Sequence, residues 1–216
     1  METKKEMIIH DVVQGTPEWH AVRCGKVSAS RFSDVMAKGR GNAESKTRSD
    51  YLEQLIDEIV DGEPALSYTN ADMQWGIEHE AEARQAYANE TGNEIVQVGF
   101  VELNERVGCS PDGLVGDDGL VEIKCPKSKT HRKYITENRC PPEYYKQIQG
   151  QMWVTGRLWC DFFSYNPRPR PPYEHLRTFL IRVTRDDVVI AEITDAVDKF
   201  IEELQVMINR LTIEEF

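Results

Sequence analysis

The chain has 216 residues, of which 40% are hydrophobic and 29% charged, and its mean hydropathy is −0.54. These values are typical of a globular protein, which we expect to be a single domain over residues 1–216 that needs no structural metal. The sequence has no apolar run long enough to span a membrane and no signal-peptide pattern, so we expect a cytoplasmic protein. The five cysteines include no CxxC pair, which argues against disulfides and a zinc site.

The net charge of −11 is distributed unevenly along the chain. Residues 19–48 carry a net +5 and residues 123–185 a net +9, whereas the segment 49–122 between them carries −16. Such asymmetry is typical of a protein that binds phosphates on one surface and faces water on another. Chance clustering of charges on solvated faces would give the same pattern.

The first half of the chain is predicted to be mainly helical. Thr16 and Asn70 are each placed to cap a helix. A Gly-, Ser- and Lys-rich stretch at 38–48 predicts a mobile, basic loop. From capping residues and apolar spacing, the segments expected to be helical are about 17–23, 28–37, 49–61 and 71–90.

The period of the apolar residues changes to two after residue 94, which predicts strands. The expected strands are 95–103, 106–109, 112–115, 120–124, 158–165 and 177–183, and the expected helices are 128–138, 142–155 and 186–211. This order predicts an α/β fold with a mixed central β-sheet flanked by α-helices.

The residues with chemical potential concentrate in one predicted hairpin. The sequence Gly116-Asp117-Asp118-Gly119 is a strong turn signal, and centring the hairpin on it places Asp112 opposite Glu122 and Ile123. The two carboxylates then lie close enough to bind one cation. Lys124 is two residues beyond Glu122 and shares its face of the strand.

Two carboxylates and a lysine in this pattern are typical of metal-dependent phosphodiester hydrolysis. Hard oxygen ligands favour Mg²⁺, for which Mn²⁺ would substitute, over zinc. The metal acidifies a water molecule, and the lysine orients that water and neutralises charge in the transition state. The alternative is a solvated hairpin whose Glu and Lys form a cross-strand ion pair.

The hairpin and its flanking sequence resemble the PD-(D/E)xK nuclease superfamily. Within it they are similar to the branch that contains phage lambda exonuclease, the viral alkaline exonucleases and the YqaJ-type recombinases. The resemblance implies a restriction-endonuclease-like core. The matching pieces, in order, are QGTPEWHAVRCGKVSAS (14–30), WGIEHE (75–80), CSPDGL (109–114), GLVEIKCP (119–126), YYKQIQGQMWVTG (144–156) and FFSYNPR (162–168).

The resemblance assigns roles to individual residues of the hairpin and of one helix. It implies that Asp112 and Glu122 are metal ligands, that the Ile123 carbonyl is a third, and that Lys124 orients the nucleophilic water. Glu80 occupies the position of a helical glutamate near the metals. Without the resemblance, Glu80 would be interpreted as one solvated carboxylate among several on its helix.

Five further positions follow from the resemblance in the same way. Gln149, with Gln147 beside it, is expected to hydrogen-bond near the catalytic lysine or the scissile phosphate. The alternative is an ordinary amphipathic helix. Arg23, Ser30 and Ser110 match a pocket for a 5′-terminal phosphate, which suits a guanidinium and hydroxyl donors. Otherwise they would be a surface arginine and two helix-capping serines.

The resemblance implies a Mg²⁺-dependent, processive exonuclease that degrades the 5′-terminated strand of double-stranded DNA and leaves 3′ overhangs for recombination. It further implies a ring-shaped homotrimer and a single-strand annealing protein as partner, in the cytoplasm of a bacterium or of a phage's host. Two alternatives remain open: an endonuclease of the same core, as in restriction or repair, and a non-catalytic module that binds DNA ends.

Overall fold

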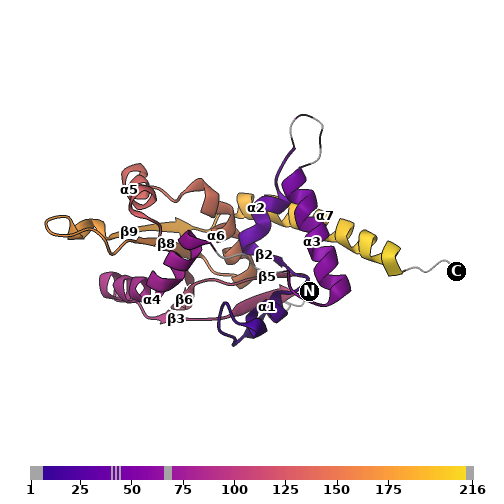
Figure 1. Ribbon diagram of the computed structural model, residues 1–216, viewed down its shortest axis with the longest axis horizontal. Helices are drawn as coiled ribbons and strands as arrows, with labels where there is room; N and C mark the ends of the chain where they lie inside the picture. Colours follow the sequence, from indigo (N-terminus) through magenta and orange to yellow (C-terminus); the bar gives the residue numbers. More distant parts are fainter. Residues whose placement is uncertain (1–6, 40, 42, 44, 66–69, 213–216) are drawn as a thin grey trace.

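The computed structural model describes residues 7–39, 41, 43, 45–65 and 70–212. Figure 1 shows their arrangement. The helices are α1 (Pro17–Arg23), α2 (Phe32–Val35), α3 (Lys46–Asp61), α4 (Ala71–Thr91), α5 (Ser128–Glu137), α6 (Pro142–Thr155) and α7 (Asp187–Thr212), with short 3₁₀ turns at Ala29–Arg31 and Glu174–Leu176. The strands are β1 (Ile8–His10), β2 (Val27–Ser28), β3 (Ile95–Val96), β4 (Phe100–Asn104), β5 (Val107–Cys109), β6 (Gly113–Val115), β7 (Gly119–Lys124), β8 (Trp159–Tyr165) and β9 (Thr178–Thr184).

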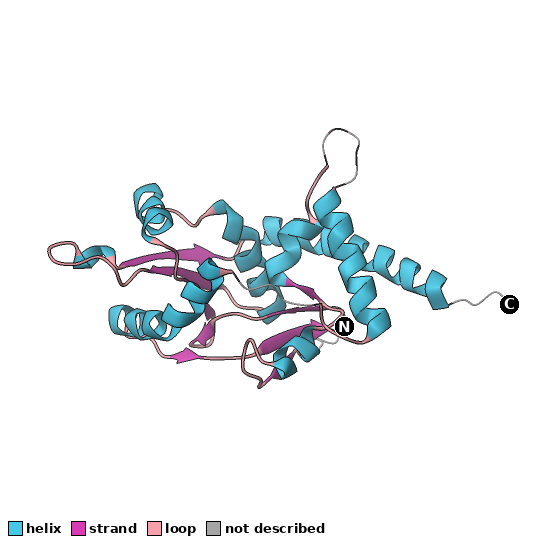
Figure 2. Cartoon of the chain, in the orientation of Figure 1, coloured by secondary structure: helices cyan, strands magenta, loops and turns pink. Residues whose placement is uncertain are grey.

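The strands form two sheets, which helices flank (Figure 2). One sheet has the order β1-β4-β5-β2 and the other β3-β6-β7-β8-β9, and both mix parallel with antiparallel pairs. The α/β class with mixed sheets is therefore confirmed, but the single central sheet expected from the sequence is divided in two.

The division falls within the segment expected to be one strand, 95–103. Its first residues form β3 in the five-stranded sheet and its last residues form β4 in the other. Gly99 lies at the crossing, where a Cβ atom would come within 2.1 Å of the Val12 carbonyl oxygen. Only glycine permits the N-terminal segment to approach the chain this closely.

The five-stranded sheet is covered on both faces, and its strands alternate between two apolar clusters. Val121 and Ile123 of β7 pack with Tyr87 of α4 on one face. Leu120 belongs to the larger cluster on the other face, which includes Ile148 of α6. Because successive strand residues point to opposite faces, Glu122 is directed toward α6 rather than α4.

The expected helix starts are borne out at both capping residues. The Thr16 hydroxyl accepts a hydrogen bond from the Trp19 amide, and the Asn70 side chain accepts bonds of 2.9 Å from the Asp72 and Met73 amides. In the expected loop 38–48, residues 40, 42 and 44 lie outside the described residues, and 46–48 already belong to α3.

All five cysteines are free thiols, as expected. None of the described helices is both long and apolar enough to cross a lipid bilayer.

Candidate active site

The hairpin of β6 and β7 has the register that the turn signal predicts. Leu114 pairs with Leu120 and Gly113 with Val121, so Asp112 directly precedes the paired residues. Asp112 Oδ2 accepts a 2.6 Å hydrogen bond from the Ile123 amide. This contact fixes the first carboxylate beside the strand that carries the second.

Glu122 is a buried carboxylate that three side chains surround. Lys124 Nζ lies 2.5 Å from Glu122 Oε1, and the same oxygen accepts a 2.7 Å hydrogen bond from Gln147 Nε2. Glu122 Oε2 accepts a bond of equal length from Gln151 Nε2. Only 1% of Glu122 is exposed, and a charge so buried requires such partners.

Lys124 is more exposed than Glu122, and its side chain remains a protonated ammonium. Burial acts to lower its pKa, but the charges of Glu122 and Asp112 outweigh burial and raise the pKa above its ordinary value. Its ammonium also lies 5.0 Å from the ring centre of Tyr144. Lys124 is therefore suited to donate hydrogen bonds to an anion or a water molecule, not to act as a base.

Asp112 is in the opposite situation, because its environment disfavours a negative charge. Burial and the neighbouring charge of Glu122 raise its pKa to about 8, and Glu80 adds to the effect. Glu80 projects from α4, forms an ion pair with Arg84, and lines the same cleft as Asp112 and Lys124. The cleft has a volume of about 500 Å³.

The donor atoms at this cleft fit a hard divalent cation. Among the described residues, no three acidic, histidine or cysteine side chains group closely enough to hold a metal ion by themselves. Asp112, Glu80 and Ile123 line the cleft, and Glu122 is buried behind the cleft residue Lys124. Their carboxylates and the Ile123 carbonyl are all oxygen donors, which Mg²⁺ prefers together with water and phosphate oxygens. A cation would also relieve the repulsion that raises the pKa of Asp112.

Gln149 is not where we expected it to be. Its side chain is fully buried, donates a 2.9 Å bond to the Thr184 carbonyl and accepts a 2.8 Å bond from the Asp186 amide. These contacts join α6 to the start of α7, and the contacts with Glu122 come from Gln147 and Gln151 instead. Helix geometry explains the error, because residues four apart share a face and residues two apart do not.

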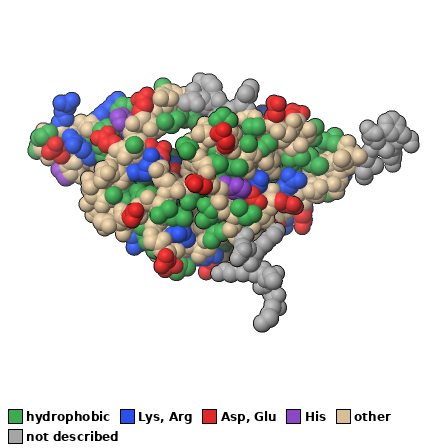
Figure 3. Space-filling view, turned by 90° about the horizontal axis from the view of Figure 1, so that it is seen from below, with side chains coloured by type: hydrophobic (Ala, Val, Ile, Leu, Met, Phe, Trp, Pro, Cys, Tyr) green, Lys and Arg blue, Asp and Glu red, His purple; other side chains and the backbone are tan. Residues whose placement is uncertain are grey.

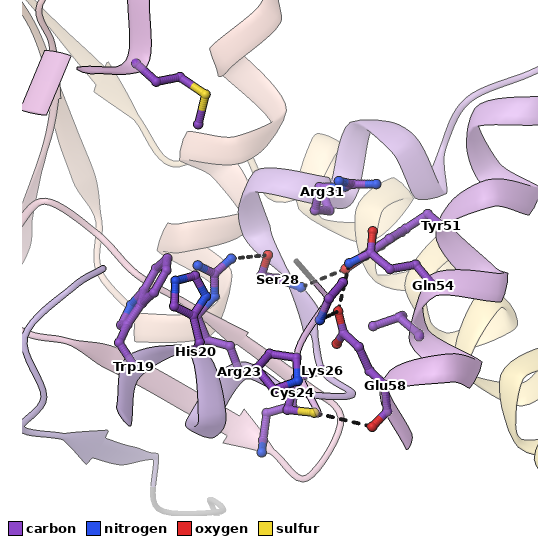
Figure 4. A pocket seen from close by; sticks show the side chains of 14 residues that line it. Trp19, His20, Arg23, Cys24, Lys26, Ser28, Arg31, Tyr51, Gln54 and Glu58 are labelled. Atoms are coloured by element: carbon purple, nitrogen blue, oxygen red, sulfur yellow. Dashed lines mark hydrogen bonds between the residues drawn. The ribbon is translucent and has the colours of Figure 1, made fainter. Parts of the chain in front are cut away.

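Arg23 is linked to Ser30 through Ser28 and to Ser110 through Trp19, and Figure 4 shows Arg23, Ser28 and Trp19 at the edge of a hollow. Arg23 Nη2 lies 3.4 Å from Ser28 Oγ, which lies 3.0 Å from Ser30 Oγ. The connection to Ser110 is Trp19, whose ring lies under the Arg23 guanidinium and whose indole N–H donates a 2.9 Å bond to Ser110 Oγ. Ser28 was missed in the sequence.

The network borders a hollow of about 430 Å³ whose charged lining is mostly basic. Arg23, Lys26 and Arg31 contribute cations, and α3 forms the opposite wall, as Figure 4 shows. The single carboxylate of the lining, Glu58, is 8% exposed and is occupied by the Gly25 amide and by Gln54. The hollow is therefore suited to an anion.

This anion pocket and the carboxylate cleft are neighbours. Met73, in the first turn of α4, lines both of them, and 47% of it is exposed. The two hollows therefore meet at the first turn of α4.

The sequence model of the YqaJ-like viral recombinase domain matches residues 18–158, which contain both parts of this site. The chain belongs to the YqaJ-like viral recombinase family. No curated protein matches it.

Among solved structures, the fold is similar to an alkaline exonuclease from Laribacter hongkongensis, with 44% identity over 91% of this chain and 96% of that one and a TM-score of 0.82. The structure of that enzyme in complex with dAMP gives a TM-score of 0.83 at the same identity and coverage. A phage-related exonuclease from Haemophilus somnus 129PT shares the fold at 17% identity, with a TM-score of 0.66 over 87% of this chain and 96% of that chain.

Proposed function

We propose that the chain is a Mg²⁺-dependent exonuclease that starts at the ends of double-stranded DNA, degrades the 5′-terminated strand in the 5′→3′ direction and leaves 3′ overhangs. The observation that carries this proposal is the adjacency of the carboxylate cleft to the Arg23 pocket. Membership of a viral recombinase family and the likeness to an alkaline exonuclease support it.

The side chains divide the hydrolytic reaction among them. Asp112 and Glu122 would hold Mg²⁺, or Mn²⁺ in its place, with the Ile123 carbonyl and Glu80 as further oxygen donors. A bound divalent cation acidifies water and offsets charge on the phosphate. Lys124 donates from its ammonium to the attacking water and to the developing negative charge. Gln147 holds Glu122 Oε1 and keeps that carboxylate oriented.

The direction of degradation follows from the anion pocket. A 5′-terminal phosphate carries more negative charge than an internal phosphodiester, and a guanidinium with hydroxyl donors binds it best. With the 5′ phosphate at Arg23, Ser30 and Ser110, the next phosphodiester reaches Lys124. Each cleavage exposes a new 5′ phosphate for the same pocket.

We extend the proposal to a homotrimeric ring that works processively in the cytoplasm and transfers its 3′ strand to a single-strand annealing protein. This part rests on the resemblance to the branch that contains phage lambda exonuclease, and membership of a viral recombinase family is consistent with it. The uneven charge is consistent with it, because the basic segments can line a channel while the acidic ones face outward. Light scattering tests the ring: three chains per particle are expected, and a monomer at working concentration would contradict it.

The decisive experiment uses linear duplexes labelled separately at each 5′ and 3′ end, with Mg²⁺ or with EDTA. We expect early release of the 5′ label, retention of the 3′ label, and no reaction in EDTA. A supercoiled circle is the control, since an enzyme that requires ends leaves it intact. Nicking of the circle, or early release of the 3′ label, would contradict the proposal.

A further inference from the structure

The loop between β8 and β9 carries a cluster of arginines that the proposed reaction does not use. Arg168, Arg170 and Arg177 lie on this loop, and Arg132 of α5 joins them around adjoining hollows of about 400 and 510 Å³. We call these four residues the arginine loop. In Figure 3, Lys and Arg side chains lie at the left end of the molecule, where Figure 1 places the β8–β9 loop.

The arginine loop is held in a defined shape. Asn166 is fully buried; it accepts a 3.0 Å bond from the Arg168 amide and donates a 2.9 Å bond to the Pro126 carbonyl. Arg177 Nε donates a 2.8 Å bond to the Pro169 carbonyl. Since Pro126 follows Lys124 by two residues, the loop is fixed to the end of the catalytic strand.

The charges of this loop are largely available to a ligand. Arg132, Arg168 and Arg170 are exposed, and within the described residues none of them forms an ion pair with a carboxylate. Arg177 alone is paired, with Glu174 at 3.4 Å. Several cations side by side without acidic partners repel one another, and a polyanion relieves that repulsion.

The arginine loop adjoins the carboxylate cleft on the side away from the anion pocket. The Arg168 guanidinium lies 4.4 Å from the ring centre of Trp75, which lines the cleft. Lys127 lines the cleft and its neighbour Ser128 lines the first hollow of the loop. The anion pocket meets the cleft at Met73 instead.

We propose that the arginine loop binds backbone phosphates of the DNA duplex that has not yet been degraded. The inference rests on the proposed function, because it takes the polarity from the anion pocket. If the terminal phosphate occupies that pocket and the scissile phosphodiester lies at Asp112, the remaining strand leaves the cleft on the opposite side. The arginine loop is the basic surface on that side.

The test compares DNA affinity on duplexes of different length, in EDTA so that no cleavage occurs. The variant is Arg132→Ala with Arg170→Ala, two exposed residues that leave the contacts of Arg168 and Arg177 in place. The matched control is Lys199→Ala with Arg210→Ala, which removes the same charge from α7 at the other end of the molecule (Figure 1). Fluorescence anisotropy measures the Kd for 5′-phosphorylated duplexes of about 8 and about 30 base pairs, at several salt concentrations.

We expect the parent protein and the control to bind the long duplex more tightly than the short one, and the loop variant to lose most of that difference. Each phosphate contact contributes about 0.9 to the slope of log K against log salt, so the slope on the long duplex falls by about 2. If the loop variant has the same Kd values and salt slope as the control, while the parent binds and degrades DNA, the loop proposal is overturned. The arginines would then be expected to bind a protein partner instead. A parent that binds no duplex would contradict the proposed function as well.

Discussion

Gln151 Nε2 donates a 2.7 Å hydrogen bond to Glu122 Oε2, and both side chains are 1% exposed. The other oxygen of Glu122 is held by Gln147 and Lys124. The side-chain oxygen of Gln151 is itself buried and, within the described residues, has no hydrogen-bond partner. A buried amide with an unsatisfied oxygen is costly, which indicates that the contact with Glu122 is what this residue provides.

Replacing Gln151 by Ala should weaken metal binding in the folded protein, in addition to the stability lost when a buried carboxylate oxygen loses its donor. Removing a group that orients a metal ligand typically costs about 10- to 100-fold in affinity or activity, and calorimetric titration with Mn²⁺ measures the affinity. Gln149→Ala is the matched control on the same helix: it should lower the free energy of unfolding by about 1–3 kcal/mol and leave Mn²⁺ affinity unchanged in the folded protein. If Gln149→Ala weakened Mn²⁺ binding and Gln151→Ala did not, Gln149 would be the glutamine that acts at the metal site.

Asp112→Asn should abolish cleavage and leave the protein at least as stable as the parent. The amide oxygen can still accept the Ile123 hydrogen bond, while the charge that burial and Glu122 disfavour is gone. We expect a loss of about 10³-fold or more in kcat together with an equal or higher Tm. Asp117→Asn, in the exposed hairpin turn, is the control. An active Asp112→Asn variant would disprove the proposed metal site.

Lys124→Ala should separate catalysis from binding. Its ammonium is proposed to act on the transition state, so kcat should fall by about 10²- to 10³-fold, while the Kd for DNA ends changes by no more than about threefold. Single-turnover cleavage and anisotropy measure the two quantities. A loss of affinity equal to the loss of kcat would mean that Lys124 serves ground-state binding instead.

Arg23→Ala should reduce discrimination between DNA ends. The parent is expected to degrade 5′-phosphorylated duplexes faster than 5′-hydroxyl duplexes, and the variant should lose most of that ratio. Trp19→Phe keeps the ring under the guanidinium but removes the hydrogen bond to Ser110, so it should have a smaller effect in the same direction. Equal rates on both ends in the parent would show that the pocket is misassigned.

Acidification should destabilise the protein through His131. This side chain is 1% exposed and hydrogen-bonded to Ser164 and to the Leu176 carbonyl, and burial lowers its pKa from 6.5. The unfolded chain then binds a proton at a higher pH than the folded one, so stability is full above about pH 6.5 and falls as the pH drops below that value. Because the raised pKa of Asp112 favours the folded state at the lower pH, the effect of His131 is measured by difference: urea unfolding at pH 7.5 and 5.5 should show that acidification destabilises the parent more than it destabilises His131→Gln. His175→Gln should behave like the parent.

The sequence predicted those parts of the molecule that depend on local pattern. The turn at 116–119 set the hairpin register, and the caps Thr16 and Asn70 set two helix starts, because each depends on neighbours in the chain. The separation of β3 from β4 depends on how closely the distant residue Val12 approaches Gly99, which no local pattern encodes. The contact between Gln151 and Glu122 was missed for the same reason, although the four-residue spacing from Gln147 was visible.

The link from β5 to β6 fixes the separation of Ser110 and Asp112. Ser110 belongs to the polar network of the anion pocket and Asp112 to the carboxylate cleft, and only Pro111 separates them. Two residue steps span at most about 7 Å, and Gln14 anchors the link with a 3.0 Å bond to the Pro111 carbonyl. If the terminal phosphate and the scissile phosphate contact these two residues in the proposed exonuclease, this short link limits how far apart the two phosphates can lie. The size of the released product would then be set by peptide geometry and not by the DNA sequence.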